Sequence, residues 1–319
     1  MSGKPTVGRD VVVTRWSVHV PRVGLESVLG ANWGPWLYSA DQAPRVLGRK
    51  GLLGKEAATR MALGVVHTAL GTVAADRRRD ERVDPGVAVV VSSNLGNVGT
   101  VQNVALALRR SGLRDVSPLD APNASSNIIA STIAIWFGFG GPNFTLCSGA
   151  RSGLDAVALG GLLLRSGRAR RVVVVGVEPE EPRAMALYAQ GTSPPRSLNP
   201  AAATVVLECA GTEDDRHPVV TNRLCSDRAP IGGRRAENSI VTGPPDGFEG
   251  ESRLIALDAI VGDTYGACGV LQTAVAAGLL VDDAGSRFCV ARICCGSAED
   301  GWTYAQLQLP ERNRRAAEG

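Results

Sequence analysis

Histidine, lysine and aromatic residues are scarce in this sequence. The 319 residues include three histidines, at positions 19, 67 and 217, and aromatic residues make up 4% of the chain. Imidazole is the commonest general acid–base group and a frequent metal ligand, so few positions are available for either role. The seven cysteines show no metal-ligand spacing and mostly lie in apolar stretches. We therefore expect buried thiols, no metal site and no cofactor.

Long apolar runs and a strong excess of charge are also missing. No run approaches the roughly 20 apolar residues of a membrane span, and the first ten residues, MSGKPTVGRD, contain no signal-peptide stretch. The net charge of +3 is too small to favour nucleic acid as a partner. We expect a cytoplasmic protein that binds neither membranes nor nucleic acid.

Short β-branched runs alternate with longer helical patterns along the chain. The runs VAVVVS and VVVVGV are apolar throughout, as strands covered on both faces require. The expected strands are 11–14, 87–92, 144–147, 172–177, 204–209, 219–224, 288–293 and 302–309. The expected helices are 55–74, 98–110, 150–166, 251–257 and 266–280. This alternation predicts a mainly parallel α/β architecture.

Two segments repeat the same order of elements. Residues 144–178 and 259–294 each lead from an apolar segment through a glycine turn to a helix rich in Ala, Gly and Leu, and then to a strand. Helices with so few polar residues are expected to be buried between sheets. We therefore predict a layered fold with two related halves, residues 1–214 and a shorter second half, 215–319. The charged stretch near 211–217 marks their boundary.

The stretch GPNFTLCSGARSG at 141–153 resembles the nucleophile region of β-ketoacyl synthases, the condensing enzymes of fatty acid and polyketide synthesis. The similarity extends without a gap over 117–155. Other segments similar to the family are VVVTRWSVHVP, VVVSSNLGN and VGDTYGACG. The resemblance implies the thiolase-like fold, with five layers in the order αβαβα and mainly buried mixed sheets.

The same resemblance implies a catalytic set that this sequence lacks. The family places a cysteine nucleophile at a helix N-terminus, two histidines that stabilise an enolate-like oxygen, and often a lysine. In the elbow at 148–153 the nucleophile position is Ala150. A histidine is replaced by Asp263 and the lysine by Asp258, while the second histidine motif aligns loosely with Thr242. The glycine loop near the C-terminus is replaced by CCGSAEDG at 294–301. We therefore expect no catalytic residues.

Three residues leave a thioester-handling acyltransferase or hydrolase open as an alternative. Cys147 precedes the elbow, where a core position in the strand is favoured over a nucleophile. Ser148 lies at the turn with no evident base. Asp263 could act as a general base, although a hydrated or arginine-paired acid is the favoured interpretation.

A scaffold that retains its glycines but has lost its catalytic groups resembles the chain length factors of type II polyketide synthases. This resemblance implies a heterodimer with an active, cysteine-containing ketosynthase, serving an acyl chain carried by acyl carrier protein. Partner-facing residues would line or cap the acyl tunnel; the candidates are Leu95, Asp120, Pro122, Asn123 and Asn127. Asp120 equally suits a turn before Pro122.

Some features depart from this pattern. The chain is shorter than usual relatives around 183–200 and 225–240, and the familiar chain length factor has glutamine where this chain has Ala150. A homodimeric scaffold that docks carrier protein through Arg168–Arg171 or Arg234-Arg235 remains a further alternative, with solvated charge favoured at both clusters.

Overall fold

The computed structural model describes residues 10–21, 23, 25, 40–71, 83–118, 120–211, 217–226, 239–242, 253–282 and 290–310. The strands are β1 (Val11–His19), β2 (Val87–Ser92), β3 (Asn143–Leu146), β4 (Arg171–Glu178), β5 (Ala201–Cys209), β6 (Val219–Ser226), β7 (Ser239–Thr242), β8 (Arg253–Ile255), β9 (Val290–Ser297) and β10 (Gly301–Gln308). The α-helices are α2 (Ala43–Leu47), α3 (Ala57–Leu70), α4 (Val98–Ser111), α5 (Ile128–Phe137), α6 (Ser152–Arg165), α7 (Pro182–Gly191), α8 (Leu257–Val261) and α9 (Cys268–Asp282). Within these residues no helix has the length and hydropathy that crossing a membrane requires.

The ten strands form one mixed sheet in the order β3-β2-β4-β5-β1-β6-β10-β9-β7-β8. Only two residue pairs, Val11–Val220 and Val12–Val219, join β1 to β6. This short junction divides the sheet into two sets of five strands. In the first set β2 pairs in parallel with β3 and β4, while β5 pairs antiparallel with β4 and β1. In the second set β7 pairs in parallel with β8 and β9, and β10 pairs antiparallel with β9 and β6. The second set thus has the same pairing pattern as the first.

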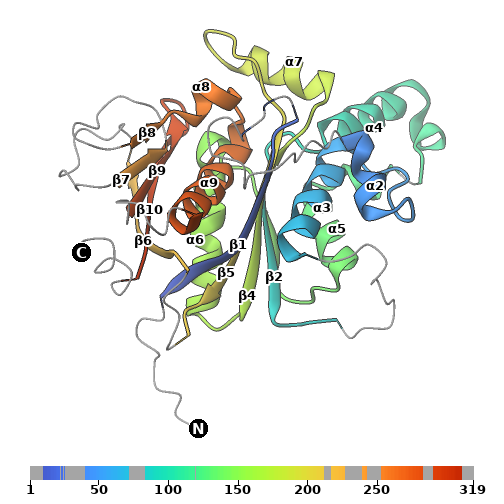
Figure 1. The fold of residues 1–319 in the computed structure, drawn as a ribbon. Helices are drawn as coiled ribbons and strands as arrows, with labels where there is room; N and C mark the ends of the chain where they lie inside the picture. Colours follow the sequence, from blue (N-terminus) through green and yellow to red (C-terminus); the bar gives the residue numbers. More distant parts are fainter. Residues whose placement is uncertain are drawn as a thin grey trace.

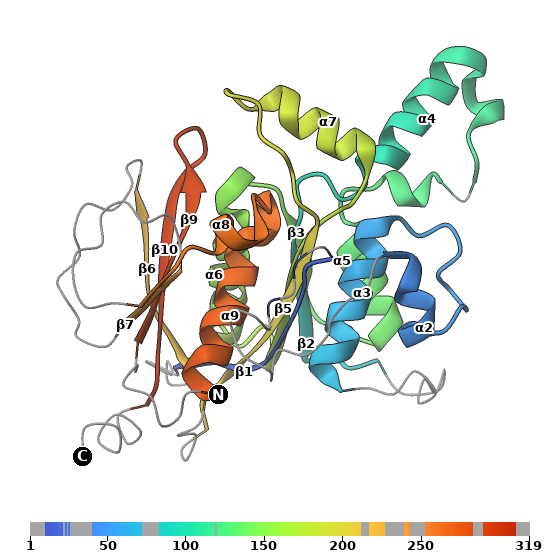
Figure 2. The same ribbon diagram turned by 45° about the horizontal axis from the view of Figure 1, so that its top comes forward.

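Helices and strands alternate in layers across the molecule. Helices α3 and α5 cover one face of the first set, and α6 and α9 lie between the two sets, as Figure 1 and Figure 2 show from two directions. In the described part of the chain no helix covers the outer face of the second set. These residues therefore form four layers, and an outer fifth layer of helices is not among them.

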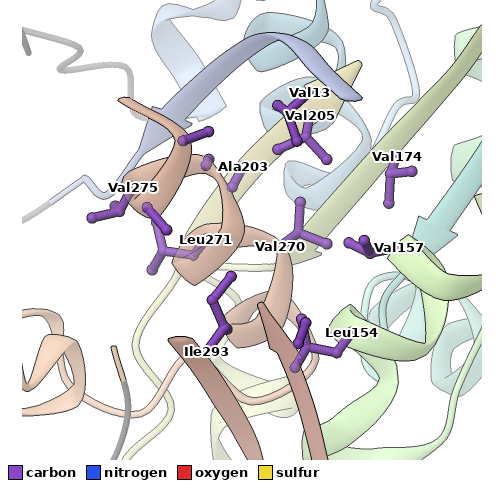
Figure 3. Packing of buried hydrophobic residues seen from close by; sticks show 14 of the residues in the cluster. Val13, Leu154, Val157, Val174, Ala203, Val205, Val270, Leu271, Val275 and Ile293 are labelled. Atoms are coloured by element: carbon purple, nitrogen blue, oxygen red, sulfur yellow. The ribbon is translucent and has the colours of Figure 1, made fainter. Parts of the chain in front are cut away.

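The largest core cluster surrounds the central helices. From Gly269 to Leu280 every residue of α9 is buried, and its side chains meet those of α6 and both sets of strands (Figure 3). A Cβ atom added to Gly153 of α6 would lie 2.6 Å from the backbone nitrogen of Gly269. The two helices can therefore touch only because glycines lie at their contact. Burial of these Ala/Gly/Leu-rich helices confirms the prediction made from their missing polar faces.

The main error in the predicted elements concerns 251–257, which was expected to be helical. Residues 253–255 instead form β8, which pairs with β7, and α8 begins only at Leu257. Pairing with a neighbouring strand outweighs the local helical pattern here. Helices α2, α5 and α7 and strand β7 were missed. The expectation of a mainly parallel sheet is also wrong, because five of the nine strand pairings are antiparallel. The proposed boundary near 211–217 falls largely outside the described residues.

Candidate functional site

The carboxyl ends of three parallel strands meet beside the first turn of α6. Asn94 follows β2, Cys147 follows β3 and Glu178 ends β4. The side chain of Asn94 binds the turn before α6 at both of its amide atoms: Nδ2 donates to the carbonyl of Gly149 at 3.0 Å, and the N–H of Gly149 donates to Oδ1 at 3.2 Å. Gly149 has a φ of 70°, in the left-handed region that favours glycine. The geometry of this elbow is therefore fixed by the end of β2.

Ala150 lies in this turn, and its backbone N–H donates a hydrogen bond to a carboxylate. The N–H of Ala150 donates to Oδ2 of Asp300 at 2.8 Å, and the hydroxyl of Ser297 donates to the same oxygen at 3.2 Å. The N–H of Asp300 donates back to Ser297 Oγ at 3.0 Å. The turn between β9 and β10 therefore holds a negative charge against the N-terminal end of α6, where the helix dipole favours an anion.

Glu178 is a fully buried acid at the centre of the site. Its two oxygens accept from the backbone N–H groups of Asn94, at 2.7 Å, and Leu95, at 3.1 Å. Burial raises the pKa of Glu178 to about 8, although these N–H groups act in the opposite direction. The acid thus joins the end of β4 to the segment after β2.

Asp263, which the sequence aligned with a histidine of the family, is held by neighbouring side chains and a backbone amide. Oδ2 of Asp263 accepts from the hydroxyl of Tyr188 at 2.6 Å and lies 3.7 Å from an Nη atom of Arg196. Its other oxygen accepts from the N–H of Tyr265 at 3.0 Å. The Asp263 side chain is thus the arginine-paired acid that the sequence favoured over a general base. Both of its oxygens are engaged.

Tyr265 extends into the same space from the segment before α9. Its ring centroid lies 4.7 Å from that of Tyr188, and its φ of 45° is the one positive value among the described non-glycine residues. Burial raises the pKa of Tyr265 to about 12, and the charges of Asp300, Glu178 and Asp263 act in the same direction. A phenol therefore lies among three acids in this side-chain cluster, which we call the acid cluster and define as Ala150, Glu178, Asp263, Tyr265 and Asp300.

Two thiols near the acid cluster donate hydrogen bonds to backbone carbonyl oxygens. Cys295 donates to the carbonyl of Ala150 at 3.1 Å, and Cys147 donates to that of Ser93 at 3.1 Å. Burial raises the pKa of the Cys147 and Cys295 thiols above their ordinary value and raises that of Cys268 to about 12. A thiol becomes a nucleophile as the thiolate, so these shifts oppose reactivity. Cys147 is more exposed than the core position expected from the sequence.

The remaining predicted site residues are not part of the acid cluster. Ser148 donates to Asp155 at 2.7 Å, and Arg151 pairs with the same carboxylate at 3.1 Å. Asp258 is exposed on α8. Thr242 ends β7, and its side chain lies outside the described part. Among the described residues no set of three or more histidine, cysteine or acidic side chains is arranged to hold a metal ion.

A cleft of about 230 Å³ lies between the N-terminal ends of α3, α4 and α7. Of the predicted tunnel residues only Leu95 lines it. The others along its wall are Glu56, Ala57, Gly96, Gly99, Thr100, Asn103, Pro179, Glu181 and Arg183. The N–H of Thr100 donates to Glu56 at 2.6 Å, and the guanidinium of Arg183 donates to Asn103 Oδ1 at 2.6 Å. Leu95 also packs in the same apolar cluster as Tyr188 and Tyr265, which connects the cleft to the acid cluster.

The other tunnel candidates hold the backbone in place. Asn123 is buried and donates to the carbonyl of Gly54 at 3.0 Å. Asn127 donates to Asn143 at 2.6 Å and accepts from Thr145 at 2.8 Å, which ties the start of α5 to β3. Pro122 begins a short 3-10 helix, and the charge of Asp120 acts on Glu56. Asp120 thus lies near the cleft without lining it.

Sequence reasoning missed Glu178 and Asp300. Glu178 had a usable signal, since an acid at the end of the fully apolar run VVVVGV stands at the carboxyl end of a buried strand. Asp300 lies in the segment 294–301, which the sequence aligned with the family's glycine loop, but its contact with Ala150 spans 150 positions. Pattern within one segment could not predict this contact.

Residues 23–203 match the family model of the β-ketoacyl synthase N-terminal domain. Over 92 residues the chain is 28% identical to the 3-oxoacyl-[acyl-carrier-protein] synthase 2 of Vibrio harveyi and to that of Vibrio cholerae serotype O1. The matched stretch covers 29% of this chain and 22% of the length of each curated relative.

The fold is similar to that of several solved structures over nearly the whole chain. The ishigamide ketosynthase/chain length factor has a TM-score of 0.68 at 19% identity, covering 94% of this chain and 99% of that one. A β-ketoacyl synthase from Burkholderia phymatum has a TM-score of 0.68 at 16% identity, with 95% and 100% covered. A type II polyketide synthase acyl-carrier protein in complex with its ketosynthase bound to the hexaketide gives 0.68 at 13%, with 95% and 99% covered. At these identities the likeness concerns the fold.

Proposed function

Because this chain belongs to the β-ketoacyl synthase family, we propose that it is a non-catalytic member that pairs with an active, cysteine-containing ketosynthase. In this proposal it resembles a chain length factor and shapes the cavity that holds an acyl chain during elongation on acyl carrier protein. The repeated strand pairing supports two related halves of the thiolase type.

The observation that carries the proposal is the state of position 150. A methyl group stands where the family has its thiol, and the neighbouring amide already binds Asp300. The lost histidine is replaced by Asp263, a carboxylate engaged by Tyr188 and Arg196. A negative charge there would repel a developing oxyanion instead of stabilising it. Losing nucleophile and oxyanion stabilisation together removes the condensation mechanism.

An apolar surface near β3 supports the pairing. β3 is an edge strand, and Phe144 on it is 43% exposed. Ile135 on the adjoining α5 is 85% exposed, and only Gly99 and Thr100 are buried in the whole of α4. An open edge strand beside exposed apolar side chains is an aggregation hazard unless another chain covers it. We infer that a homologous synthase covers this surface, in a pseudo-two-fold arrangement.

The cleft beside Leu95 supports the role in shaping a cavity. It is lined by residues of α4, by the start of α7 and by the segment after β2 that contains Leu95. In the proposed heterodimer Leu95 sets the width of the space available to the growing acyl chain. Burial raises the pKa of Glu56 in the wall of the cleft, and the charge of Asp120 acts in the same direction. This is a steric and solvational role that requires no turnover.

Two contacts disfavour the alternative functions. Ser148, the hydroxyl that a thioester hydrolase would need, is bonded to Asp155 and not to an imidazole. In the cluster 168–171, Arg170 pairs with Asp84 and Arg171 with Glu208, so these cations are neutralised locally and not presented to an acidic carrier. Arg234 and Arg235 lie outside the described residues.

Co-expression with a cysteine-containing ketosynthase from the same biosynthetic locus tests the proposal. We expect a stable one-to-one complex by size-exclusion chromatography with light scattering, and elongation of carrier-bound malonyl units by the complex. Replacing the partner's cysteine should abolish elongation, whereas Ala150→Gly in this chain should leave it unchanged. A homodimer that never binds the synthase contradicts the pairing. Turnover by this chain alone that is lost in Asp263→Asn contradicts the non-catalytic role.

A further inference from the structure

The Asp300 carboxylate accepts a hydrogen bond from the backbone amide of the elbow. In acyl transfer, backbone N–H groups at the nucleophile bind the oxygen that becomes negative in the transition state. In this chain the N–H of Ala150 is already bonded to Oδ2 of Asp300 at 2.8 Å. We propose that Asp300 is a built-in anionic ligand of this amide and that it keeps thioester carbonyl groups from binding there. This rests on the proposed function only in taking position 150 as the former nucleophile position.

The carboxylate is held in this place from its own turn. The hydroxyl of Ser297 donates to the oxygen that also binds Ala150, and the N–H of Asp300 donates to that hydroxyl. Ser297 is buried at the end of β9, a strand anchored by eight residue pairs to β10. Because the turn is short and two hydrogen bonds join Asp300 to Ser297, the carboxylate is already in position before a ligand binds.

The elbow in turn is shaped to receive the carboxylate. A Cβ atom added to Gly149 would lie 2.2 Å from Asp300 Cγ, so glycine is required for the close approach. On the other side Tyr265 is close enough for the Asp300 charge to raise the pKa of its phenol. The amide of Ala150 therefore faces a partly buried carboxylate held between the elbow and the Ser297 turn, with the Tyr265 phenol within reach of its charge. A second anion at this amide would meet both steric overlap and like-charge repulsion.

The hydrogen bond between Asp300 and the Ala150 amide also predicts how readily a cysteine thiol introduced at position 150 would ionise. Without Asp300, the N-terminal end of α6 would stabilise a thiolate. With Asp300 in place, its negative charge opposes ionisation of that thiol, and its hydrogen bond uses the amide. Restoring the cysteine alone is therefore insufficient for reactivity. The acid must also be neutralised.

Thiol alkylation of the full-length chain without any partner tests this inference. The reference variant combines Ala150→Cys with Cys147→Ser, which removes the exposed neighbouring thiol. The reaction of the thiol introduced at position 150 with iodoacetamide is followed by peptide-resolved mass spectrometry between pH 6 and 10. Adding Asp300→Asn should lower the pKa of that thiol by about one unit or more, which raises the alkylation rate at pH 7 roughly tenfold. The control Glu299→Gln removes the adjacent acid, which is exposed, and should change the rate less than about twofold.

The outcomes separate cleanly. An Asp300→Asn rate and pH profile equal to those of the reference or of the Glu299→Gln control overturn the proposal. If Asp300→Asn fails to fold by circular dichroism, Ser297→Ala takes its place. That change releases one of the donors to the carboxylate, and an alkylation rate that does not rise would equally overturn the proposal. No synthase partner enters the measurement, so its failure is distinguishable from a failure of the pairing.

Discussion

Gly149 satisfies two separate requirements, a left-handed backbone and contact with a carboxylate. Its φ is 70°, and an added Cβ atom would overlap Asp300. Gly138, the residue after α5, offers a matched comparison because its φ is 72° and nothing lies within 4 Å of an added Cβ atom. The two glycines therefore separate the cost of backbone strain from that of the contact.

We predict that Gly149→Ala lowers the free energy of unfolding more than Gly138→Ala does. The backbone alone costs about 1–2 kcal/mol at either position. At Gly149 the methyl group must also displace Asp300 from the amide of Ala150, and losing a hydrogen bond to a charged group adds about 1.5–3 kcal/mol. Urea unfolding of both variants measures the difference. Equal losses would mean that the contact with Asp300 contributes nothing to stability.

At the scale of elements, the end of β4 is joined to the segment after β2 by a buried acid. One oxygen of Glu178 accepts a hydrogen bond from the N–H of Asn94, and the other accepts one from the N–H of Leu95. Burial raises its pKa from 4.5 to about 8, so the folded protein retains a proton that the unfolded chain has already released. This contact makes the stability of the site depend on pH.

We predict that the free energy of unfolding falls as pH rises from about 4.5 to about 8. In that window the unfolded state binds fewer protons than the folded state, so the contribution of Glu178 is complete below 4.5 and is lost by about 8. Each unit of pKa difference corresponds to about 1.4 kcal/mol. Glu178→Gln, which cannot titrate, should be less pH-dependent in urea unfolding at pH 5, 6.5 and 8. Asp115→Asn, at an exposed acid, serves as the control; a Gln variant that retains the full slope would refute the assignment.

The elements that sequence predicted best are those whose pattern depends only on burial. The helices α6 and α9 contain almost no polar residue, and this alone predicted that they lie between strands. Strand β8 could not be predicted in this way, because only its pairing with β7 makes three residues extended. From the family resemblance the sequence predicts that Ala150 stands at the nucleophile position. The hydrogen bond between the Ala150 amide and Asp300 could not be predicted, because it joins segments 150 positions apart.

For the whole molecule, the strand order ends at β3 on one side and at β8 on the other. Beside β3, Asn127 is hydrogen-bonded to Asn143 and Thr145 of the strand, and among the described residues only β2 pairs with β3. A rigid, half-apolar edge suits pairing with another chain better than exposure to water.

We predict that Phe144→Lys weakens association of this chain with its synthase partner at least about tenfold, with little effect on its own stability. Phe144 is 43% exposed on the open edge, so a lysine there remains hydrated in the single chain but would be buried in the pair. Analytical ultracentrifugation of the mixed proteins gives the dissociation constant, and thermal unfolding of the separate chain checks its fold. Leu53→Lys is the matched control, because Leu53 is 91% exposed in the turn before α3, on a different segment from the β3 edge. Equal affinities for both variants would place the partner on another surface, and an unstable Phe144→Lys chain would show that this side chain serves the fold and not the pairing.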